Sequence, residues 1–160
     1  MATSKFVYVI YIATTPEKLW QALLDGRFTR EYWEHDNVSD WRPGSAWEHR
    51  RIDADGTVDI AGYVVESEPP RRLVLTWAEP KDRARREKHS RVTLEIEPIE
   101  DMVRLSVTHD ELEPGSDMLH SISDGWPRVL CSLKSFVETG RPLKTWAGRR
   151  HESSRGEADA

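Results

Sequence analysis

The feature that most constrains the fold is a long amphipathic pattern near the C-terminal end of the chain. Between Ser116 and Thr139, apolar residues recur every three or four positions, which is the spacing of a helix with one buried face. Gly140 and Pro142 are expected to end this helix. Pro127 removes a backbone hydrogen bond, so together with Gly125 it is expected to kink or break the helix. The apolar stripe consists of Leu119, Ile122, Trp126, Val129, Leu130, Leu133, Phe136 and Val137.

Extended segments are predicted to precede this helix. Turn signals between Ser39 and Asp110 come at the short intervals typical of antiparallel strands, and they leave room for about five or six strands. Apolar and polar residues alternate along 91–97 and again along 102–109. These two segments are therefore expected to form a hairpin with one buried face. The residues expected on that face are Val92, Leu94, Ile96, Val103, Leu105 and Val107.

The N-terminal part of the chain predicts a strand followed by two short helices. Residues 5–13 are β-branched and aromatic on both faces, which predicts a strand that is covered on each side. Thr15 is expected to cap the first helix, which the Asp25-Gly26 pair then ends. The second helix is expected over residues 28–35, and the pair of helices is expected to close one end of the sheet.

Several segments carry a resemblance to a known family. They are TTPEKLWQALLD, FTREYW, the W-x-x-G from Trp41 to Gly44, EPPRRLVLTW, RVTLEIEP and GWPRVLCSLKSFVETG. Through them the chain resembles the SRPBCC, or START-like, superfamily, and within it the bacterial proteins similar to the C-terminal domain of activators of the heat-shock-protein 90 ATPase. The resemblance implies an α+β helix-grip fold, in which a curved antiparallel sheet of about six to seven strands wraps around a long C-terminal helix. One such domain is expected over residues 1–146, and the polar residues 147–160 are expected to form a disordered tail.

The resemblance leaves three functions open, because proteins of this superfamily bind lipids, hormones and polyketides, assist chaperones, or catalyse cyclisations. The leading hypothesis is binding of a small apolar or aromatic molecule between the sheet and the C-terminal helix. A co-chaperone-like interaction module is the first alternative, and a cyclase- or hydrolase-type enzyme is the second. The eukaryotic activators carry a further N-terminal domain, whereas the first predicted strand here begins at Lys5. This chain alone is therefore not expected to stimulate a chaperone.

Composition narrows the partners. The formal net charge of −5 does not favour nucleic acid, which usually binds to basic domains. The apolar run from Phe6 to Ala13 is short for a membrane span, and the N-terminus lacks the pattern of a signal peptide, so a cytoplasmic protein is expected. The six histidines show no metal-ligand spacing, and neither a metal nor a cofactor is expected. A second copy of the chain and a chaperone are the candidate macromolecular partners.

The tryptophans are the main candidates for a binding site. The chain has seven, which is many for this length, and such large side chains either fill a core or line a concave site. Gly62, inside a predicted strand, favours the second interpretation, because a glycine there often marks a bend or a close approach. Parity along the strands and the helix stripe gives the predicted ligand-binding residues: Trp33, Trp77, Leu94, Leu105, Val107, His109, Trp126 and Leu130.

Few residues suggest chemistry of their own. His109 is a candidate polar contact in the cavity, although a strand-end histidine facing solvent is the simpler interpretation. No other inward-facing titratable group is suggested by the strand alternation, so no catalytic residue is assigned. Cys131 is expected to be buried as a small apolar side chain. The charged segment 81–89 is expected to be a solvated, mobile loop, with a gate over the cavity as the alternative.

Overall fold

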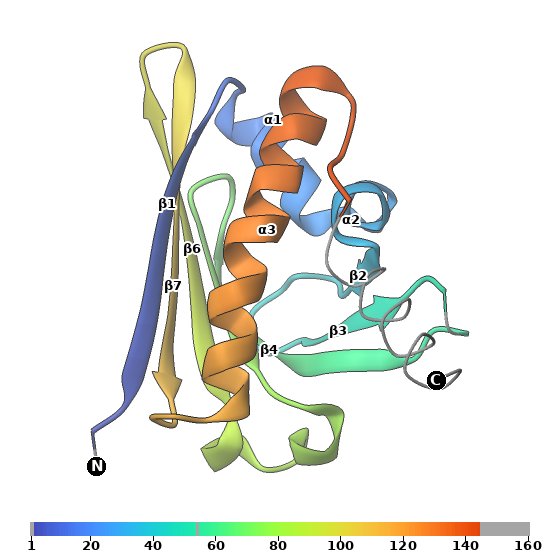
Figure 1. The fold of residues 1–160 in the computed structure, drawn as a ribbon, viewed down its shortest axis with the longest axis vertical. Helices are drawn as coiled ribbons and strands as arrows, with labels where there is room; N and C mark the ends of the chain where they lie inside the picture. Colours follow the sequence, from blue (N-terminus) through green and yellow to red (C-terminus); the bar gives the residue numbers. More distant parts are fainter. Residues whose placement is uncertain (1, 54, 145–160) are drawn as a thin grey trace, which may run out of the picture.

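The computed structural model describes residues 2–53 and 55–144, and its centre is a strongly curved sheet of seven antiparallel strands. The strand order is β1-β7-β6-β5-β4-β3-β2, so β1 and β2 form the two edges. Figure 1 shows the long helix α3 lying against this sheet, with β1 on one side of it and β2 and β3 on the other. The strands are β1 Ser4–Ile12, β2 His35–Val38, β3 Ala46–Arg51, β4 Val58–Glu68, β5 Arg72–Trp77, β6 Ser90–Ile99 and β7 Met102–Leu112.

Three α-helices complete the fold: α1 Pro16–Leu24, α2 Gly26–Trp33 and α3 Asp117–Thr139. Two single-turn 3₁₀ helices, η1 Pro80–Asp82 and η2 Arg86–Lys88, lie between β5 and β6. The predicted α+β helix-grip fold of about six to seven strands is thereby confirmed. Within the described residues, no helix is long and apolar enough to cross a membrane.

The two short helices begin where side-chain caps are available. The Thr15 hydroxyl accepts a hydrogen bond from the Lys18 amide and caps α1, as predicted. Asp25 directly follows α1 and is also the N-cap of α2. Its carboxylate accepts a hydrogen bond from the Arg27 backbone amide at 2.9 Å. The second helix therefore starts two residues earlier than the predicted 28–35. It ends at Trp33, two residues earlier than predicted, and the next residue, Glu34, has a φ of 58°.

The C-terminal helix runs without interruption through Pro127, so of the two predicted outcomes, a kink or a break, the break is wrong. Cys131 is exposed, and its predicted burial is also wrong. Successive helical residues differ by about 100° around the axis, so Cys131 falls off the stripe that its neighbour Leu130 occupies. Its Sγ lies 4.0 Å from the Tyr8 hydroxyl on β1.

The predicted hairpin is β6 and β7, and its alternation is as expected. Leu94 pairs with Val107 and Ile96 with Leu105, and all four side chains are buried. The first strand differs from its prediction: the outward side chains of Val7, Val9 and Tyr11 are 51%, 46% and 46% exposed. β1 is therefore covered on one face only, the face that packs against α3 and the core.

Gly62 of β4 marks a close approach, which the sequence pattern predicted. A Cβ at this position would overlap the backbone carbonyl oxygen of Thr76. Gly62 pairs with Trp47 of β3, whose indole nitrogen donates to that same oxygen at 2.8 Å. The absent side chain thus lets the carbonyl reach a large buried ring at the bend of the sheet.

The charged segment between β5 and β6 is anchored to the sheet by His89. This buried histidine contacts the Thr76 hydroxyl through Nδ1 at 2.8 Å and the Asp82 carbonyl oxygen through Nε2 at 3.0 Å. The Arg86 guanidinium lies 3.6 Å above the centre of the Tyr63 ring, which adds a cation–π contact. The segment forms two short 3₁₀ turns, and these contacts hold them against the sheet. The predicted solvated loop is wrong at His89, because that side chain is buried.

Candidate functional site

Six aromatic rings gather between the sheet and α3, and we call them the aromatic cluster. Trp77, at the end of β5, is at its centre. The ring centroids of Trp47, His109 and Trp126 lie 5.3, 5.4 and 5.5 Å from the Trp77 centroid. The cluster consists of Trp33, Trp47, His49, Trp77, His109 and Trp126.

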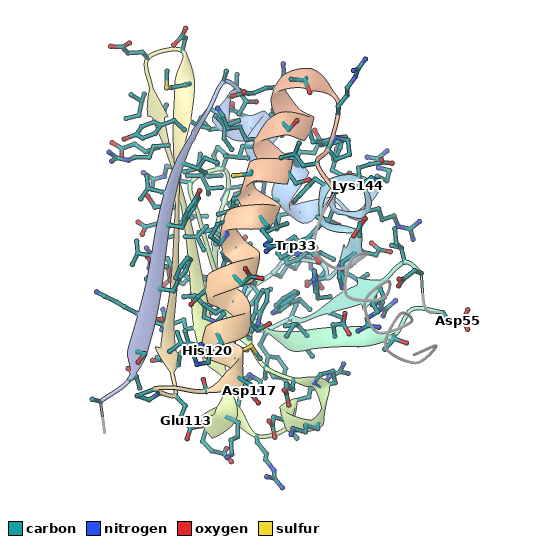
Figure 2. All side chains as sticks on the ribbon, viewed as in Figure 1. Trp33, Asp55, Glu113, Asp117, His120 and Lys144 are labelled. Atoms are coloured by element: carbon teal, nitrogen blue, oxygen red, sulfur yellow. The ribbon has the colours of Figure 1, made fainter. Side chains whose placement is uncertain are left out.

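Trp33 is the member of the cluster nearest to solvent. It ends α2 and is only partly buried, and Figure 2 places it beside the middle of α3 on the side of β2 and β3. Its ring centroid lies 4.6 Å from that of His49 and 5.5 Å from that of Trp126. Trp33 is thus positioned to separate the interior of the cluster from solvent.

The structure brings the predicted ligand-binding residues into one core. Four of them, Trp33, Trp77, His109 and Trp126, belong to the aromatic cluster and contact one another through their rings. The four aliphatic residues lie in the surrounding core, and each is at most 6% exposed. Those aliphatic residues are Leu94, Leu105, Val107 and Leu130.

His109 is fully buried, so the simpler expectation of a solvent-facing histidine is wrong. β7 continues to Leu112, and His109 therefore lies within the sheet and not at its end. The Trp126 indole donates to its Nδ1 at 3.1 Å, which places the ring hydrogen on Nε2, 2.8 Å from the Ser90 hydroxyl. That hydroxyl donates in turn to the Trp77 carbonyl oxygen. Burial lowers the pKa of His109 to about 3, so the ring is neutral at pH 7.

A polar pair, His35 and Asp59, lies next to the cluster on the β2–β4 side of the sheet. Both nitrogens of His35 face acceptors, because Nδ1 lies 2.9 Å from the Trp33 carbonyl oxygen and Nε2 lies 2.9 Å from the Asp59 carboxylate. Both contacts are hydrogen bonds only when both nitrogens carry a hydrogen. Although burial opposes it, hydrogen bonds from His35 and Arg51 hold the pKa of Asp59 at about 2.

His49 connects this polar group to the aromatic cluster. Its ring stacks on His35 with centroids 3.8 Å apart, and its Nδ1 lies 2.5 Å from Oδ1 of Asn37. The amide oxygen is an acceptor, so the hydrogen is on Nδ1 and the lone pair is on Nε2. Burial, and then the neighbouring His35, lower the pKa of His49 well below its ordinary value. His49 therefore remains neutral and presents an acceptor.

One buried polar atom of the cluster has no hydrogen-bond partner within the described residues. It is Nε1 of Trp77, a donor on a side chain that is only 6% exposed. An unmade hydrogen bond of a buried group costs about 1–3 kcal/mol, so such an atom marks a place where a further group can bind.

Sequence reasoning missed His35 and His49. A usable signal existed for His49, because it shares the inward parity of Trp47 on β3. For His35 there was none, since β2 is four residues long and its sequence, HDNV, has no apolar alternation.

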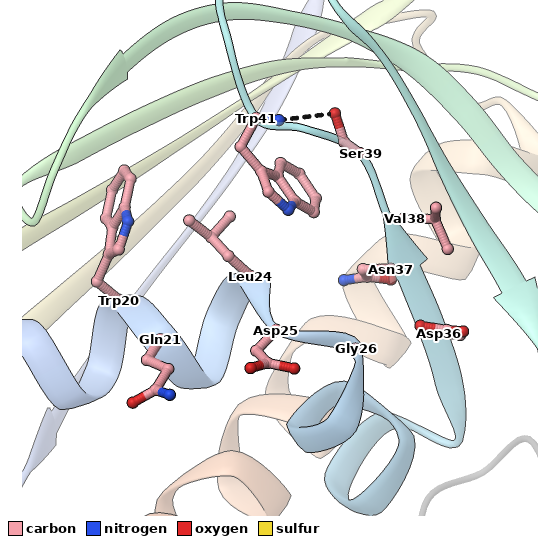
Figure 3. A pocket seen from close by; sticks show the side chains of 10 residues that line it. All are labelled: Trp20, Gln21, Leu24, Asp25, Gly26, Asp36, Asn37, Val38, Ser39 and Trp41. Carbon is pink, nitrogen blue, oxygen red and sulfur yellow. Dashed lines mark hydrogen bonds between the residues drawn. The ribbon is translucent and has the colours of Figure 1, made fainter.

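A separate open pocket lies on the outer side of α1 and β2, with a volume of about 590 Å³. Figure 3 shows the Trp20 and Trp41 rings on either side of Leu24. None of the predicted ligand-binding residues lines it, but Asn37, the partner of His49, does. The lining consists of Trp20, Gln21, Leu24, Asp25, Gly26, Asp36, Asn37, Val38, Ser39 and Trp41.

The side chains of the cluster are better suited to binding a molecule than to catalysing a reaction. The Ser90–His109 pair resembles a nucleophile and its base, but the Ser90 hydroxyl already donates to a carbonyl oxygen. The lowered pKa of His49 makes it a weak base. Across residues 2–53 and 55–144, no three histidine, cysteine, aspartate or glutamate side chains are grouped so as to hold a metal ion.

A curved sheet around a long C-terminal helix, with a buried aromatic cluster between them, defines a helix-grip domain. Its family follows from sequence: the chain belongs to the family described as activator of Hsp90 ATPase homolog 1-like protein, whose profile matches residues 13–138. No curated protein matches the chain.

Solved structures show the same fold. The Aha1 dimer from Colwellia psychrerythraea has a TM-score of 0.70 at 22% identity, over 86% of this chain and 98% of that one. CalU16 from Micromonospora echinospora has a TM-score of 0.68 at 23% identity, over 96% and 84%. DynU16, from the dynemicin biosynthetic locus, has a TM-score of 0.67 at 19% identity, over 86% of this chain and 48% of that one.

Proposed function

We propose that this protein binds a small apolar or aromatic molecule at the aromatic cluster, between the sheet and α3. The observation that carries the proposal is the buried indole nitrogen of Trp77, which has no partner among the described residues although five aromatic rings surround it. Aromatic walls with a few polar atoms are the usual composition of a small-molecule site. CalU16 and DynU16 have similar folds, and DynU16 is described as a putative protein in the dynemicin biosynthetic locus.

The alternatives rank lower for physical reasons. The co-chaperone hypothesis rests on the family description alone. The cyclase or hydrolase hypothesis needs an acid or base beside the ligand, and the low pKa of His49 and His109 makes both poor proton acceptors.

A fluorescence titration tests the proposal. N-phenyl-1-naphthylamine is a neutral apolar probe whose emission rises when it leaves water, and we expect it to bind the parent protein saturably. Trp33→Ala removes a wall of the cluster and should weaken binding by at least about tenfold, because burying a large aromatic ring contributes on the order of 1.5–3 kcal/mol.

Trp20→Ala is the matched control, since Trp20 is also a partly buried tryptophan on a short helix but lines the outer pocket. It should leave the affinity unchanged. Loss of binding in Trp20→Ala with retention in Trp33→Ala would place the probe in the outer pocket and contradict the proposal.

A second copy of the chain is the macromolecular partner that the surface favours. The outer face of the edge strand β1 exposes Val7, Val9 and Tyr11. Lys134 and Glu138 of α3 bind the Tyr11 carbonyl and the Ala13 amide, which leaves the N-terminal half of the edge for pairing. One similar structure is a dimer.

Sedimentation velocity tests this second proposal. We expect the parent to dimerise and Val7→Lys to be monomeric, because a charge on the edge strand opposes pairing. Val65→Lys, at an exposed apolar position of β4, should leave the dimer intact. A monomeric parent would overturn the proposal.

A further inference from the structure

We propose that the outer pocket, on α1 and β2, binds a small aromatic cation such as an arylamidinium or arylammonium compound. The proposal is carried by a cavity of about 590 Å³ whose lining combines tryptophan rings with carboxylates. Among the described residues, no lysine, arginine or histidine lines this cavity. The proposal concerns a second site and does not depend on binding at the aromatic cluster.

The apolar part of the pocket is formed by two tryptophans that are only partly buried. Trp20 of α1 and Trp41, which follows β2, lie on either side of Leu24 (Figure 3). The volume between the lining residues is within the range of small-molecule sites. Indole rings attract cations more strongly than other aromatic side chains do, so these walls favour a positively charged guest over a neutral one.

The conformation of Trp41 shows that its ring is held in a defined place. Its φ is 60°, in the left-handed region that a bulky residue rarely adopts. The Trp41 amide donates to the Ser39 hydroxyl at 3.0 Å, and the centroid of the Trp41 ring lies 6.4 Å from that of Trp47 in the core. Residues held in such conformations gather at active sites and ligand sites, which supports a role for Trp41 beyond packing.

Two carboxylates give the pocket its charge. Asp25, which follows α1, is bound by Arg27 at 2.7 Å, and Asp36 of β2 is bound by Arg30 at 2.9 Å. Both arginine side chains are largely exposed, at 80% and 57%, and neither of them lines the pocket. A carboxylate accepts at more than one position, so these ion pairs leave acceptor sites for a cation in the pocket.

Asp36 is the better placed of the two carboxylates. Asp25 accepts from both the side chain and the backbone amide of Arg27, whereas the hydrogen bond described for the Asp36 side chain is that from Arg30 to Oδ2. The other oxygen, Oδ1, occupies space that a side chain at Gly26 would need, because a Cβ there would overlap it. Asp36 and Gly26 both line the pocket, so we assign the cationic group of the ligand to Asp36.

Three probes of similar shape and different charge test the proposal. Benzamidine is a cation, benzamide is neutral and benzoate is an anion, and each is titrated at neutral pH and low salt while the ¹H–¹⁵N resonances of the tryptophan indoles are followed. Benzamidine should shift the resonances of Trp20 and Trp41 and leave that of Trp77 in place. It should bind the parent at least about tenfold more tightly than benzamide does, because only the cation gains the carboxylate and cation–π interactions. Benzoate should not bind, since the pocket carries negative charge.

Asp36→Asn removes the charge and keeps the shape, so the advantage of benzamidine over benzamide should fall to about threefold or less. Asp124→Asn is the matched control, because Asp124 is also paired with an arginine, Arg128, but lies on α3 and does not line the pocket. It should keep the ratio of the parent.

Equal affinities of the parent for benzamidine and benzamide would overturn the assignment of a cationic ligand, and so would the absence of benzamidine binding. A shift of Trp77 without shifts of Trp20 and Trp41 would place the cation at the aromatic cluster and overturn the proposal as well. The titrations of the parent decide these questions even if a variant does not fold. Failure of N-phenyl-1-naphthylamine to bind would count against the aromatic cluster alone, since that probe is neutral.

Discussion

Acidification from pH 7 to pH 3 is expected to lower the free energy of unfolding by roughly 3–5 kcal/mol through His109 alone. Burial holds the pKa of His109 at about 3 in the folded protein, whereas an unfolded histidine titrates near its ordinary value of 6.5. Between these values the unfolded state binds the extra proton, so stability is present above about pH 6.5 and is lost as the pH falls toward 3.

Urea denaturation at a series of pH values measures this effect. His109→Gln offers one acceptor to Trp126 and one donor to Ser90, and it does not titrate, so its stability should fall much less across the same range. His120→Gln, at an exposed position of α3, should behave like the parent. An unchanged slope in His109→Gln would show that His109 is not the buried neutral group described above.

Gly62→Ala is expected to destabilise the protein by roughly 1–3 kcal/mol, through overpacking at the bend of the sheet. The new methyl group would overlap the Thr76 carbonyl oxygen, so β4 and β5 must move apart. That movement also strains the hydrogen bond from Trp47 to the same oxygen.

A thermal melt of the variant checks this expectation. Val65→Ala, at a partly exposed position of the same strand, should change stability by about 0.5 kcal/mol or less. If Gly62→Ala is as stable as Val65→Ala, the close approach of Thr76 does not limit the fold.

Local periodicity was sufficient to predict α3 and the β6–β7 hairpin, because each buries a single face whose spacing is visible in the chain. It was not sufficient for β1. Its two faces are equally apolar in sequence, and the number of faces that are covered depends on where the strand lies in the sheet. Cys131 was assigned to the wrong side because a stripe read from apolar residues does not separate neighbours that lie about 100° apart.

Sequence periodicity predicted the tryptophans of the candidate site but not its histidines. Trp33, Trp77 and Trp126 are recognisable from their size and parity, and the structure places them together. The polar atoms that give the site its chemistry depend on long-range pairing. His35 and His49 meet only because β2 pairs with β3, and a four-residue strand without apolar alternation leaves no periodic signal.

The most direct test of binding at the aromatic cluster is the same probe titration followed by ¹H–¹⁵N NMR of the tryptophan indoles. Each indole N–H gives its own resonance, and assignments follow from single Trp→Phe variants. Saturation with N-phenyl-1-naphthylamine should shift the resonances of Trp77, Trp33 and Trp126 and leave those of Trp20 and Trp41 in place. Shifts confined to Trp20 and Trp41, with the Trp77 resonance unmoved, would show that the interior is a closed core and that the probe binds at the outer surface.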